Sequence, residues 1–335
     1  MLDSRFIDRR RVLKTLFCSS AAMMLQLRDR EARADIIPNA AHVLMIGDFG
    51  TGGKEQANVA NALKTFVTKL GIRPESLFLL GDNFYGKDSK GFSVNSRRWK
   101  DEIEDMYPSS SFPGSCWAVL GNHDYHDNKG GEQIQLAYSK QVETRFKLPS
   151  KWYRFELGAP ESMVTAVAID TNFPEVSGGK KKSGMWTNAC LSEDEVQRQL
   201  EWLDCELAKP RAPFTIVLGH HPLYSNGSHG DLPILAQSLG TLLAKHKVHA
   251  YFCGHDHDLQ HLELENQFTS YVLSGGGGAK VRKMRTDREM PFGKEVYGFT
   301  HMQIEPTALT ITHHGVDQTA LHRFRKSIDG TFTIA

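Results

Sequence analysis

Residues 76–86, SLFLLGDNFYG, combine the pattern of a buried strand with a polar tip. The continuous apolar run 77–80 is typical of a strand that is covered on both faces of a sheet. The run ends at a glycine, and Asp82 and Tyr85 follow directly. A core strand that ends in a carboxylate and a phenol indicates a site for chemistry, and not only a change of chain direction.

The same pattern recurs elsewhere: an apolar run of strand length, a glycine, and then side chains that can bind metal. The other segments read HVLMIGDFG (42–50), CWAVLGNHD (116–124), FTIVLGHHP (214–222) and VHAYFCGHDHD (248–258). In α/β sheets, ligands bind beyond the carboxyl ends of the strands. We therefore expect all these tips to converge on one edge.

Helical patterns between these strands predict an α/β fold. Apolar residues recur at helical spacing over 54–70, and Ser192 and Glu195 form a capping box that opens a helix to about residue 208. A third helix is expected over 233–246. Strands of a second sheet are expected over 267–278, 295–305 and 308–315, with a terminal hairpin over 321–335.

The side chains at the tips are too many for one metal ion and suit two ions that share a ligand. They are Asp48, Asp82, Tyr85, Asn122, His220, His255 and His257. The carboxylates and the phenol, with one imidazole, suit a trivalent ion, whereas the amide and two imidazoles, with a shared carboxylate, suit a divalent ion. Free tyrosine titrates near pH ~10, so a phenolate ligand indicates a strongly acidic ion such as Fe(III), with Asp82 as the expected bridge. Metal pairs ~3.5–4 Å apart serve phosphoryl chemistry.

Taken together, the tips resemble the small, single-domain purple acid phosphatases of the tartrate-resistant type, in the metallophosphoesterase superfamily. The matching blocks are Asp48-Phe-Gly50, Gly81-Asp82-Asn-Phe-Tyr85, Gly121-Asn122-His123-Asp124, Val217-Leu-Gly-His220 and Gly254-His255-Asp-His257. They lie within residues 42–278. The resemblance implies two mixed β-sheets packed as a sandwich flanked by helices, with the metal site at the C-terminal strand ends.

The resemblance also implies which residues hold each ion. Fe(III) would be held by Asp48, Asp82, Tyr85 and His257. A divalent ion, iron, zinc or manganese, would be held by Asp82, Asn122, His220 and His255. His123 would contact phosphate and help to protonate the leaving group, and His229 matches the second substrate histidine. His221 is left without a role.

These features predict an acid phosphatase that hydrolyses small phosphomonoesters at acid pH. A metal-bound hydroxide would attack phosphorus, and a histidine would protonate the departing alkoxide. One alternative is a phosphodiesterase or nucleotidase on the same metal core. Another is a non-hydrolytic iron protein that makes radicals or stores metal. A pure binding module fits least well, because the ligand set is complete.

The first 34 residues differ in pattern from the rest of the chain. Arg9-Arg10-Arg11-Val12-Leu13-Lys14 fits a twin-arginine export signal, and Ala32-x-Ala34 offers a cleavage site. The charged residues 28–31 fit export poorly, and a basic amphipathic arm on a cytosolic protein is the alternative. We expect an export signal over 1–34 and one catalytic domain over 35–335, in a periplasmic or secreted protein.

The composition limits the partners. A net charge of +1 does not favour nucleic acid, and no apolar run reaches the ~18 residues of a membrane span. Small phosphate esters are therefore the expected partners. An even number of cysteines remains after residue 34, which permits disulfides in an exported protein. Cys116 and Cys253 lie in apolar runs, where burial as small hydrophobic residues is expected.

Several remaining features are read as structural. His42, His126, His246, His249 and His261 are assigned no site, nor is Asp170, which we read as a carboxylate that either supports the ligands or is structural. The run SGGGG (274–278) is read as a flexible turn near the edge of the site. The segment 172–190 is rich in glycine and lysine and is expected to be a long surface loop. In the family, such a loop can overhang the metal site.

Overall fold

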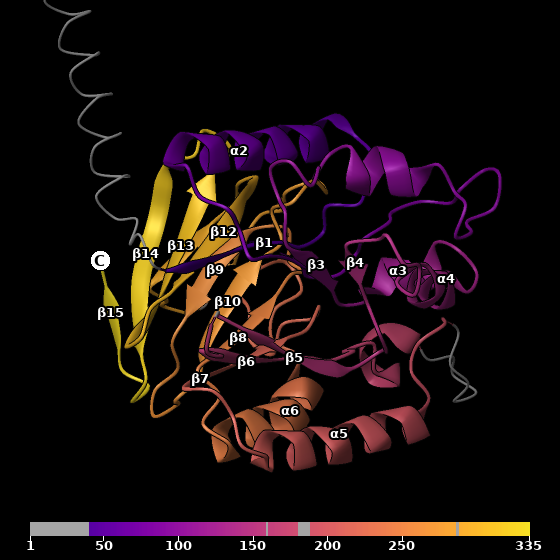
Figure 1. Cartoon of the computed structure of the whole chain (residues 1–335). Helices are drawn as coiled ribbons and strands as arrows, with labels where there is room; N and C mark the ends of the chain where they lie inside the picture. The colour runs from indigo at the N-terminus through magenta and orange to yellow at the C-terminus, as the bar shows by residue number, and fades with distance from the viewer. Residues whose placement is uncertain (1–39, 159, 180–187, 286–287) are drawn as a thin grey trace, which may run out of the picture. The chain divides into compact units, whose positions relative to one another are not determined.

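The computed structural model describes residues 40–158, 160–179, 188–285 and 288–335. The predicted export segment 1–34 lies outside the described residues. Residues 41–335 form two mixed β-sheets that pack face to face, with helices on both outer sides (Figure 1). The predicted α/β sandwich is confirmed.

The first sheet has the strand order β15-β14-β13-β12-β1-β2-β3-β4. Its strands are β1 (Ala41–Ile46), β2 (Ser76–Leu79), β3 (Ser115–Ala118), β4 (Phe146–Lys147), β12 (Gly298–Ile304), β13 (Ala308–Gly315), β14 (Ala320–Ser327) and β15 (Phe332–Ile334). Strands β1 to β4 run parallel, and β12 pairs antiparallel with β1. Because β1, β2 and β3 are parallel, their carboxyl ends lie at the same edge of this sheet.

The second sheet has the order β11-β9-β10-β8-β7-β6-β5. Its strands are β5 (Tyr153–Leu157), β6 (Val164–Ala168), β7 (Phe214–Leu218), β8 (Ala250–Cys253), β9 (Leu259–Leu262), β10 (Ser270–Ser274) and β11 (Phe292–Lys294). The prediction that the later strands complete one second sheet is wrong. Strand β10 pairs with β8 in the second sheet, whereas β12 and β13 extend the first sheet from β1. Partner choice depends on contacts between distant segments, which a local pattern does not contain.

Helices cover both outer faces of the sandwich. Helix α2 (Lys54–Leu70) covers one face, and α5 (Glu193–Ala208) and α6 (Pro233–Lys245) cover the other, whereas α3 (Asn122–His126) and α4 (Gly131–Tyr138) lie at one side, next to β4 (Figure 1). On the first sheet, Phe66 of α2 packs against Phe299 and His314. On the second sheet, Leu203 of α5 and Leu239 of α6 share one buried cluster with the strands. The helices predicted over 54–70, 193–208 and 233–246 are thus confirmed, and none of the described helices is long and apolar enough to cross a membrane.

The described part of segment 172–190 is more buried than its composition predicted. Asn172 and Phe173 are buried, and Pro174–Gly178 forms a π-helical turn. The backbone N–H of Leu191 donates to the carbonyl of Asn172 at 2.9 Å, which ties the two ends of the segment together. Residues 172–178 pack largely on the domain, so the prediction of a surface loop is wrong for them, whereas Asn188 and Ala189 are exposed. The lysines at 180–182 lie outside the described residues.

The described cysteines are free thiols, and two of them are buried. Cys116 and Cys253 are buried, as predicted, and burial raises the pKa of both thiols. Cys190 and Cys205 are also free thiols. No disulfide joins the cysteines that the structure describes.

Candidate metal centre

The tips of β1, β2, β3, β7 and β8 meet at one junction between the two sheets. The backbone N–H of Gly47, after β1, donates to Ser274 of β10 at 2.7 Å. The Nδ1–H of His220, after β7, donates to the carbonyl of Leu80, after β2, at 2.8 Å. The predicted convergence is therefore observed, but it joins the edges of two sheets and not one edge of a single sheet.

Two glycines let the chains approach closely at this junction. Gly81 has a φ of +88°, and a Cβ placed on it would lie 2.4 Å from Nδ1 of His220. A Cβ on Gly254 would lie 2.4 Å from Oδ2 of Asp48. Real contacts are never this short, so a side chain at either position would displace a predicted ligand.

Tyr85 lies at the centre of one group of predicted ligands. Its Oη is 2.7 Å from Oδ2 of Asp82, 3.2 Å from Oδ1 of Asp48 and 3.3 Å from Nε2 of His257. The carbonyl of Lys280 lies 2.8 Å from Nδ1 of His257 and can only accept a hydrogen bond. Nδ1 therefore carries the proton, and Nε2 presents its lone pair to the group.

Asn122 lies at the centre of the other group. Its Oδ1 is 3.2 Å from Nε2 of His220 and 3.1 Å from Nδ1 of His255. These two ring nitrogens are themselves 3.3 Å apart. Because Nδ1 of His220 donates to Leu80, its Nε2 also faces the group as an unprotonated nitrogen.

Asp82 lies between the two groups. Its Oδ2 contacts Tyr85, while its Oδ1 is 3.5 Å from Nε2 of His220. Asp48, Asp82 and His220 each place a ligand atom within 4.8 Å of the others. We call the seven predicted ligands in these two groups the ligand cluster.

Three members of the ligand cluster have a strained backbone conformation. Asp48, Asp82 and His255 have φ values of 57°, 53° and 69°, a region that non-glycine residues rarely adopt. Such strain persists only where the surroundings impose it, and it concentrates at functional sites. Here it lies directly after the glycines that end β1, β2 and β8.

The protonation of the ligand cluster fits a bound cation. Burial and the charge of Asp82 raise the pKa of Asp48 well above its ordinary value. Burial lowers the pKa of His220 and lowers that of His255 well below the ordinary value, so both rings are neutral and offer lone pairs. Crowded acid oxygens and neutral imidazoles are complemented by a metal ion in their midst. The residues present therefore fit a metal site.

His123, predicted as a catalytic residue, lies beside the ligand cluster. Its ring centroid is 4.3 Å from that of Tyr85, and its backbone N–H donates to Oδ1 of Asp82 at 2.9 Å. Its Nδ1 is 3.0 Å from Oδ2 of Asp127, so that carboxylate accepts the Nδ1–H. Its side chain is 33% exposed, which places it where a substrate has access.

His229, the second predicted catalytic residue, lies on the opposite side, next to His255. The centroids of these two rings are 4.2 Å apart. Oδ1 of Asp256 accepts from the backbone N–H of His229 at 3.0 Å and from its Nδ1–H at 2.8 Å. The sequence pattern gave no role to Asp256, which lies between two predicted ligands and fixes the ring of His229.

Two other features differ from the sequence interpretation. His221, left without a role, shares a possible metal-binding group with His220 and His255 and lies 2.9 Å from Thr171 through Nδ1. The run 274–278 is buried and is not a flexible turn. A Cβ on Gly275 would lie 2.0 Å from the carbonyl oxygen of Asp256, so these glycines allow the chain to pack beneath the ligand cluster.

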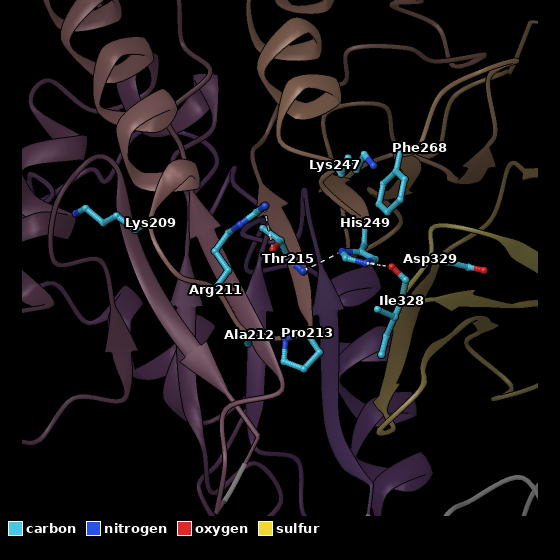
Figure 2. A pocket seen from close by; sticks show the side chains of 10 residues that line it. All are labelled: Lys209, Arg211, Ala212, Pro213, Thr215, Lys247, His249, Phe268, Ile328 and Asp329. Carbon is cyan, nitrogen blue, oxygen red and sulfur yellow. Dashed lines mark hydrogen bonds between the residues drawn. The ribbon is translucent and has the colours of Figure 1, made fainter.

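A cavity of about 610 Å³ lies away from the ligand cluster, at the amino-terminal side of β7 and β8 (Figure 2). It is lined by Lys209, Arg211, Ala212, Pro213, Thr215, Lys247, His249, Phe268, Ile328 and Asp329. His249 spans it, 3.1 Å from the backbone N–H of Thr215 and 3.0 Å from the carbonyl of Ile328. Its ring nitrogens are thus already bonded within the protein, which agrees with the structural interpretation of His249. We therefore place the candidate functional site at the junction of the two sheets, where the predicted metal ligands meet, and not in this cavity.

Sequence comparisons identify relatives over most of the chain. Residues 36–259 match the calcineurin-like phosphoesterase family. The chain is 30% identical to human tartrate-resistant acid phosphatase type 5 over 323 residues, which cover 91% of this chain and 97% of that protein. It is also 30% identical to purple acid phosphatase 7 of Arabidopsis thaliana, with 84% of each chain covered.

Solved structures with the same fold include two different kinds of protein. The GAP50 anchor in the inner membrane complex of Plasmodium matches with a TM-score of 0.69 at 20% identity, over 85% of this chain and 87% of that one. A purple acid phosphatase from yellow lupin seeds matches with a TM-score of 0.64 at 18% identity, over 86% of this chain and 54% of that one. These two structures support the fold alone. From the sequence relatives, the chain belongs to the calcineurin-like phosphoesterases and, among them, to the purple acid phosphatases of the tartrate-resistant type.

Proposed function

We propose that this enzyme hydrolyses small phosphomonoesters at acid pH with a dinuclear centre of Fe(III) and a divalent iron, zinc or manganese ion. The observation that carries the proposal is the position of Asp82, with one carboxylate oxygen toward the Tyr85 group and the other toward the Asn122 group. In this proposal Asp48, Asp82, Tyr85 and His257 hold Fe(III), and Asp82, Asn122, His220 and His255 hold the divalent ion. When bound, the ions polarise the phosphate oxygens and activate water as the nucleophile.

The residues around the ligand cluster bind the substrate and supply the proton for the leaving group. His123 gives a proton from its outward-facing nitrogen to the departing alkoxide, while Asp127 holds the other nitrogen and thereby sets the direction of the ring. His229, held by Asp256, binds the substrate from the opposite side. Acid solution favours the protonated imidazole that a proton donor needs.

The proposal is tested by metal analysis together with a visible spectrum of the oxidised protein. Two ions per chain, at least one of them iron, and an absorption band lost in Tyr85→Phe are the expected results. A colourless protein with two zinc ions would remove Fe(III) from the proposal. Comparing the rates for 4-nitrophenyl phosphate and its bis-ester at several pH values separates a monoesterase from a phosphodiesterase. A metal-loaded protein that hydrolyses neither ester would favour a non-hydrolytic role.

We further propose that residues 1–34 are an export signal of the twin-arginine type, which would place the enzyme in the periplasm or outside the cell. The basis is the sequence alone, since these residues lie outside the described part of the chain. Replacing Arg9, Arg10 and Arg11 by lysine should retain uncut, metal-loaded protein inside the cell. Unchanged export would point to a different route.

A further inference from the structure

The segment close after β6 is completely buried but contributes no member of the ligand cluster. Asp170, Thr171 and Asn172 are each 0% exposed. The side-chain amide of Gln199, on α5, accepts from the backbone N–H of Asp170 at 2.8 Å and donates to the backbone carbonyl of Asp170 at 2.8 Å. This two-way bond holds the segment on a helix. We call Asp170, Thr171 and Asn172 the β6 tip.

The β6 tip holds the turn that carries Asn122 at both of its ends. Before Asn122, the carbonyl of Leu120 accepts from Nδ2 of Asn172 at 3.0 Å. After it, the phenol of Tyr125 donates to Oδ2 of Asp170 at 2.6 Å. Oδ1 of Asp170 also accepts from the backbone N–H and from Nδ2 of Asn172, at 2.9 and 2.8 Å, which joins the two contacts into one network. The turn therefore cannot shift without breaking buried hydrogen bonds.

Thr171 holds the chain at the next ligand, His220. Its Oγ1 accepts from the backbone N–H of His220 at 3.3 Å and from that of His221 at 2.9 Å. These bonds use both lone pairs of the hydroxyl, so its contact with Nδ1 of His221, at 2.9 Å, is a donation. The only lone pair of the neutral His221 ring is therefore bonded to Thr171 and is not offered to an ion. This ring packs against that of His255, with centroids 4.3 Å apart, so Thr171 also supports the third ligand.

The ligands reached in this way all belong to the Asn122 group. Among the described residues, no hydrogen bond joins the β6 tip to the unshared ligands of the Tyr85 group, which are Asp48, Tyr85 and His257. The β6 tip therefore supports one half of the ligand cluster and not the other.

We propose that the β6 tip positions Asn122, His220 and His255 for the divalent ion and thereby sets the affinity of this ion alone. This inference rests on the proposed function, because it assumes that each group holds its own ion. Apart from the shared Asp82, the Asn122 group offers only uncharged ligands. Such ligands attract an ion less strongly than carboxylate and phenolate oxygens do, so the affinity depends more on ligands that are already in place.

The test measures Zn²⁺ binding by calorimetry in protein that keeps Fe(III) after mild chelation of the divalent ion. Thr171→Val preserves the shape of the side chain but leaves two buried backbone N–H groups without an acceptor. Loss of such supporting contacts typically costs ~10–100-fold in metal affinity, so Kd for Zn²⁺ should rise by ~10-fold or more. Thr171→Ser retains the hydroxyl and should keep Kd within about 3-fold of the wild type. In both variants, the visible band and the iron content should be unchanged.

Tyr125→Phe tests the other contact of the β6 tip. It removes the bond to Asp170 and keeps the ring in the core, so it should also raise Kd for Zn²⁺ by ~10-fold. Thr165→Val is the matched control. Thr165 is buried near the opposite end of β6, and its Oγ1 accepts from the backbone N–H of Ala212 at 2.9 Å. This variant also loses a buried bond but no support of a ligand, so its Kd should stay within about 2-fold of the wild type.

Three results decide the inference in a protein with the expected metals. Weaker Zn²⁺ binding with an unchanged band supports it, and a loss in only one of the two variants shows which contact carries it. An unchanged Kd in both Thr171→Val and Tyr125→Phe overturns it. A parallel loss of iron also overturns it, because the β6 tip would then support both groups. If Thr171→Val does not fold, Tyr125→Phe decides.

A failure of the proposed function has a different signature. A wild type that carries two ions but shows no band, or hydrolyses no ester, removes that function and leaves the inference open to a second measurement. During dialysis against a chelator, Thr171→Val should then lose one ion faster than the wild type and the other at the wild-type rate. Equal rates for both ions overturn the inference. A wild type that retains fewer than two ions overturns both proposals.

Discussion

Asp82 is the single residue whose replacement should disturb the most. Its two oxygens face different groups of the ligand cluster, so Asp82→Asn weakens both groups at once. Asn122→Ala removes an oxygen whose hydrogen-bond contacts, among the described residues, are with His220 and His255. We expect Asp82→Asn to lose both ions and Asn122→Ala to lose mainly the divalent ion, as measured by elemental analysis after gel filtration. Equal loss of both metals in the two variants would contradict this division of ligands.

His123 should matter most for substrates that need a proton. Alkyl leaving groups are strongly basic and depend on a donor, whereas activated aryl leaving groups depart without one. General acid catalysis contributes typically 10²–10⁴-fold, so His123→Ala should slow alkyl esters by about that factor and aryl esters far less. The measurement is kcat for a series of monoesters with leaving groups of increasing basicity. A uniform loss across the series would remove His123 from the acid role.

At the scale of elements, the close approach of the two sheets depends on Gly81, which follows β2 and leaves space for His220. In Gly81→Ala, the added methyl group would collide with His220, and the positive φ would add backbone strain. Gly71 also has a positive φ, of +67°, but a Cβ there meets nothing within 4 Å. Gly71→Ala should therefore cost only about 1–2 kcal/mol of stability, because of the left-handed backbone, and leave metal content intact. Gly81→Ala should lose metal as well as stability, and equal behaviour of the two variants would contradict the close packing.

Most helices and strands could be predicted from the sequence, because each depends on residues that are close together in the chain. Apolar spacing predicted α2 with its observed bounds, and the Ser192 capping box is present, with Ser192 Oγ accepting from the Glu195 N–H at 3.2 Å. The members of the ligand cluster were found because ligands follow glycine at strand ends. The pairing of β12 with β1 was not found, nor was the burial of residues 274–278. Both depend on segments far apart in the chain, and a run of glycines reads equally well as flexible or as tightly packed.

At the scale of the whole molecule, the buried histidines lower the stability of the fold at acid pH. Burial lowers the pKa values of nine histidines outside the ligand cluster, among them His126, His221 and His249. The other six lie in strands, five of them in the first sheet. They are His42, His261, His301, His313, His314 and His322. For His314 the pKa falls from 6.5 to about 4. Between these two values the unfolded chain binds more protons than the folded one, so stability falls as pH falls, and the loss stops below about pH 4.

Replacing His314 should flatten this dependence. Its ring packs against Phe66 and Phe299, with centroids 4.6 and 5.2 Å away, so His314→Phe keeps an aromatic ring in place. The variant loses the hydrogen bond to the carbonyl of Gln318 at every pH. Between pH 6.5 and pH 4, however, its free energy of unfolding should fall by up to roughly 3 kcal/mol less than that of the wild type. Urea unfolding of metal-free protein at several pH values measures this without interference from metal release. An unchanged slope would contradict the expected role of His314.

The division of the ligand cluster between two sheets has a consequence for how the enzyme is made. Asp48, Asp82, Tyr85 and Asn122 follow strands of the first sheet and leave the ribosome early, whereas the three histidines follow β7 and β8 and emerge late. In the proposed centre, neither ion would meet its full set of ligands until the second sheet has docked on the first, so loading would follow folding. Once bound, the ions resist separation of the sheets, because they bind only the docked form. On this proposal, the metals that the finished enzyme carries would be those present where the chain completes its fold, which need not be those present where it works.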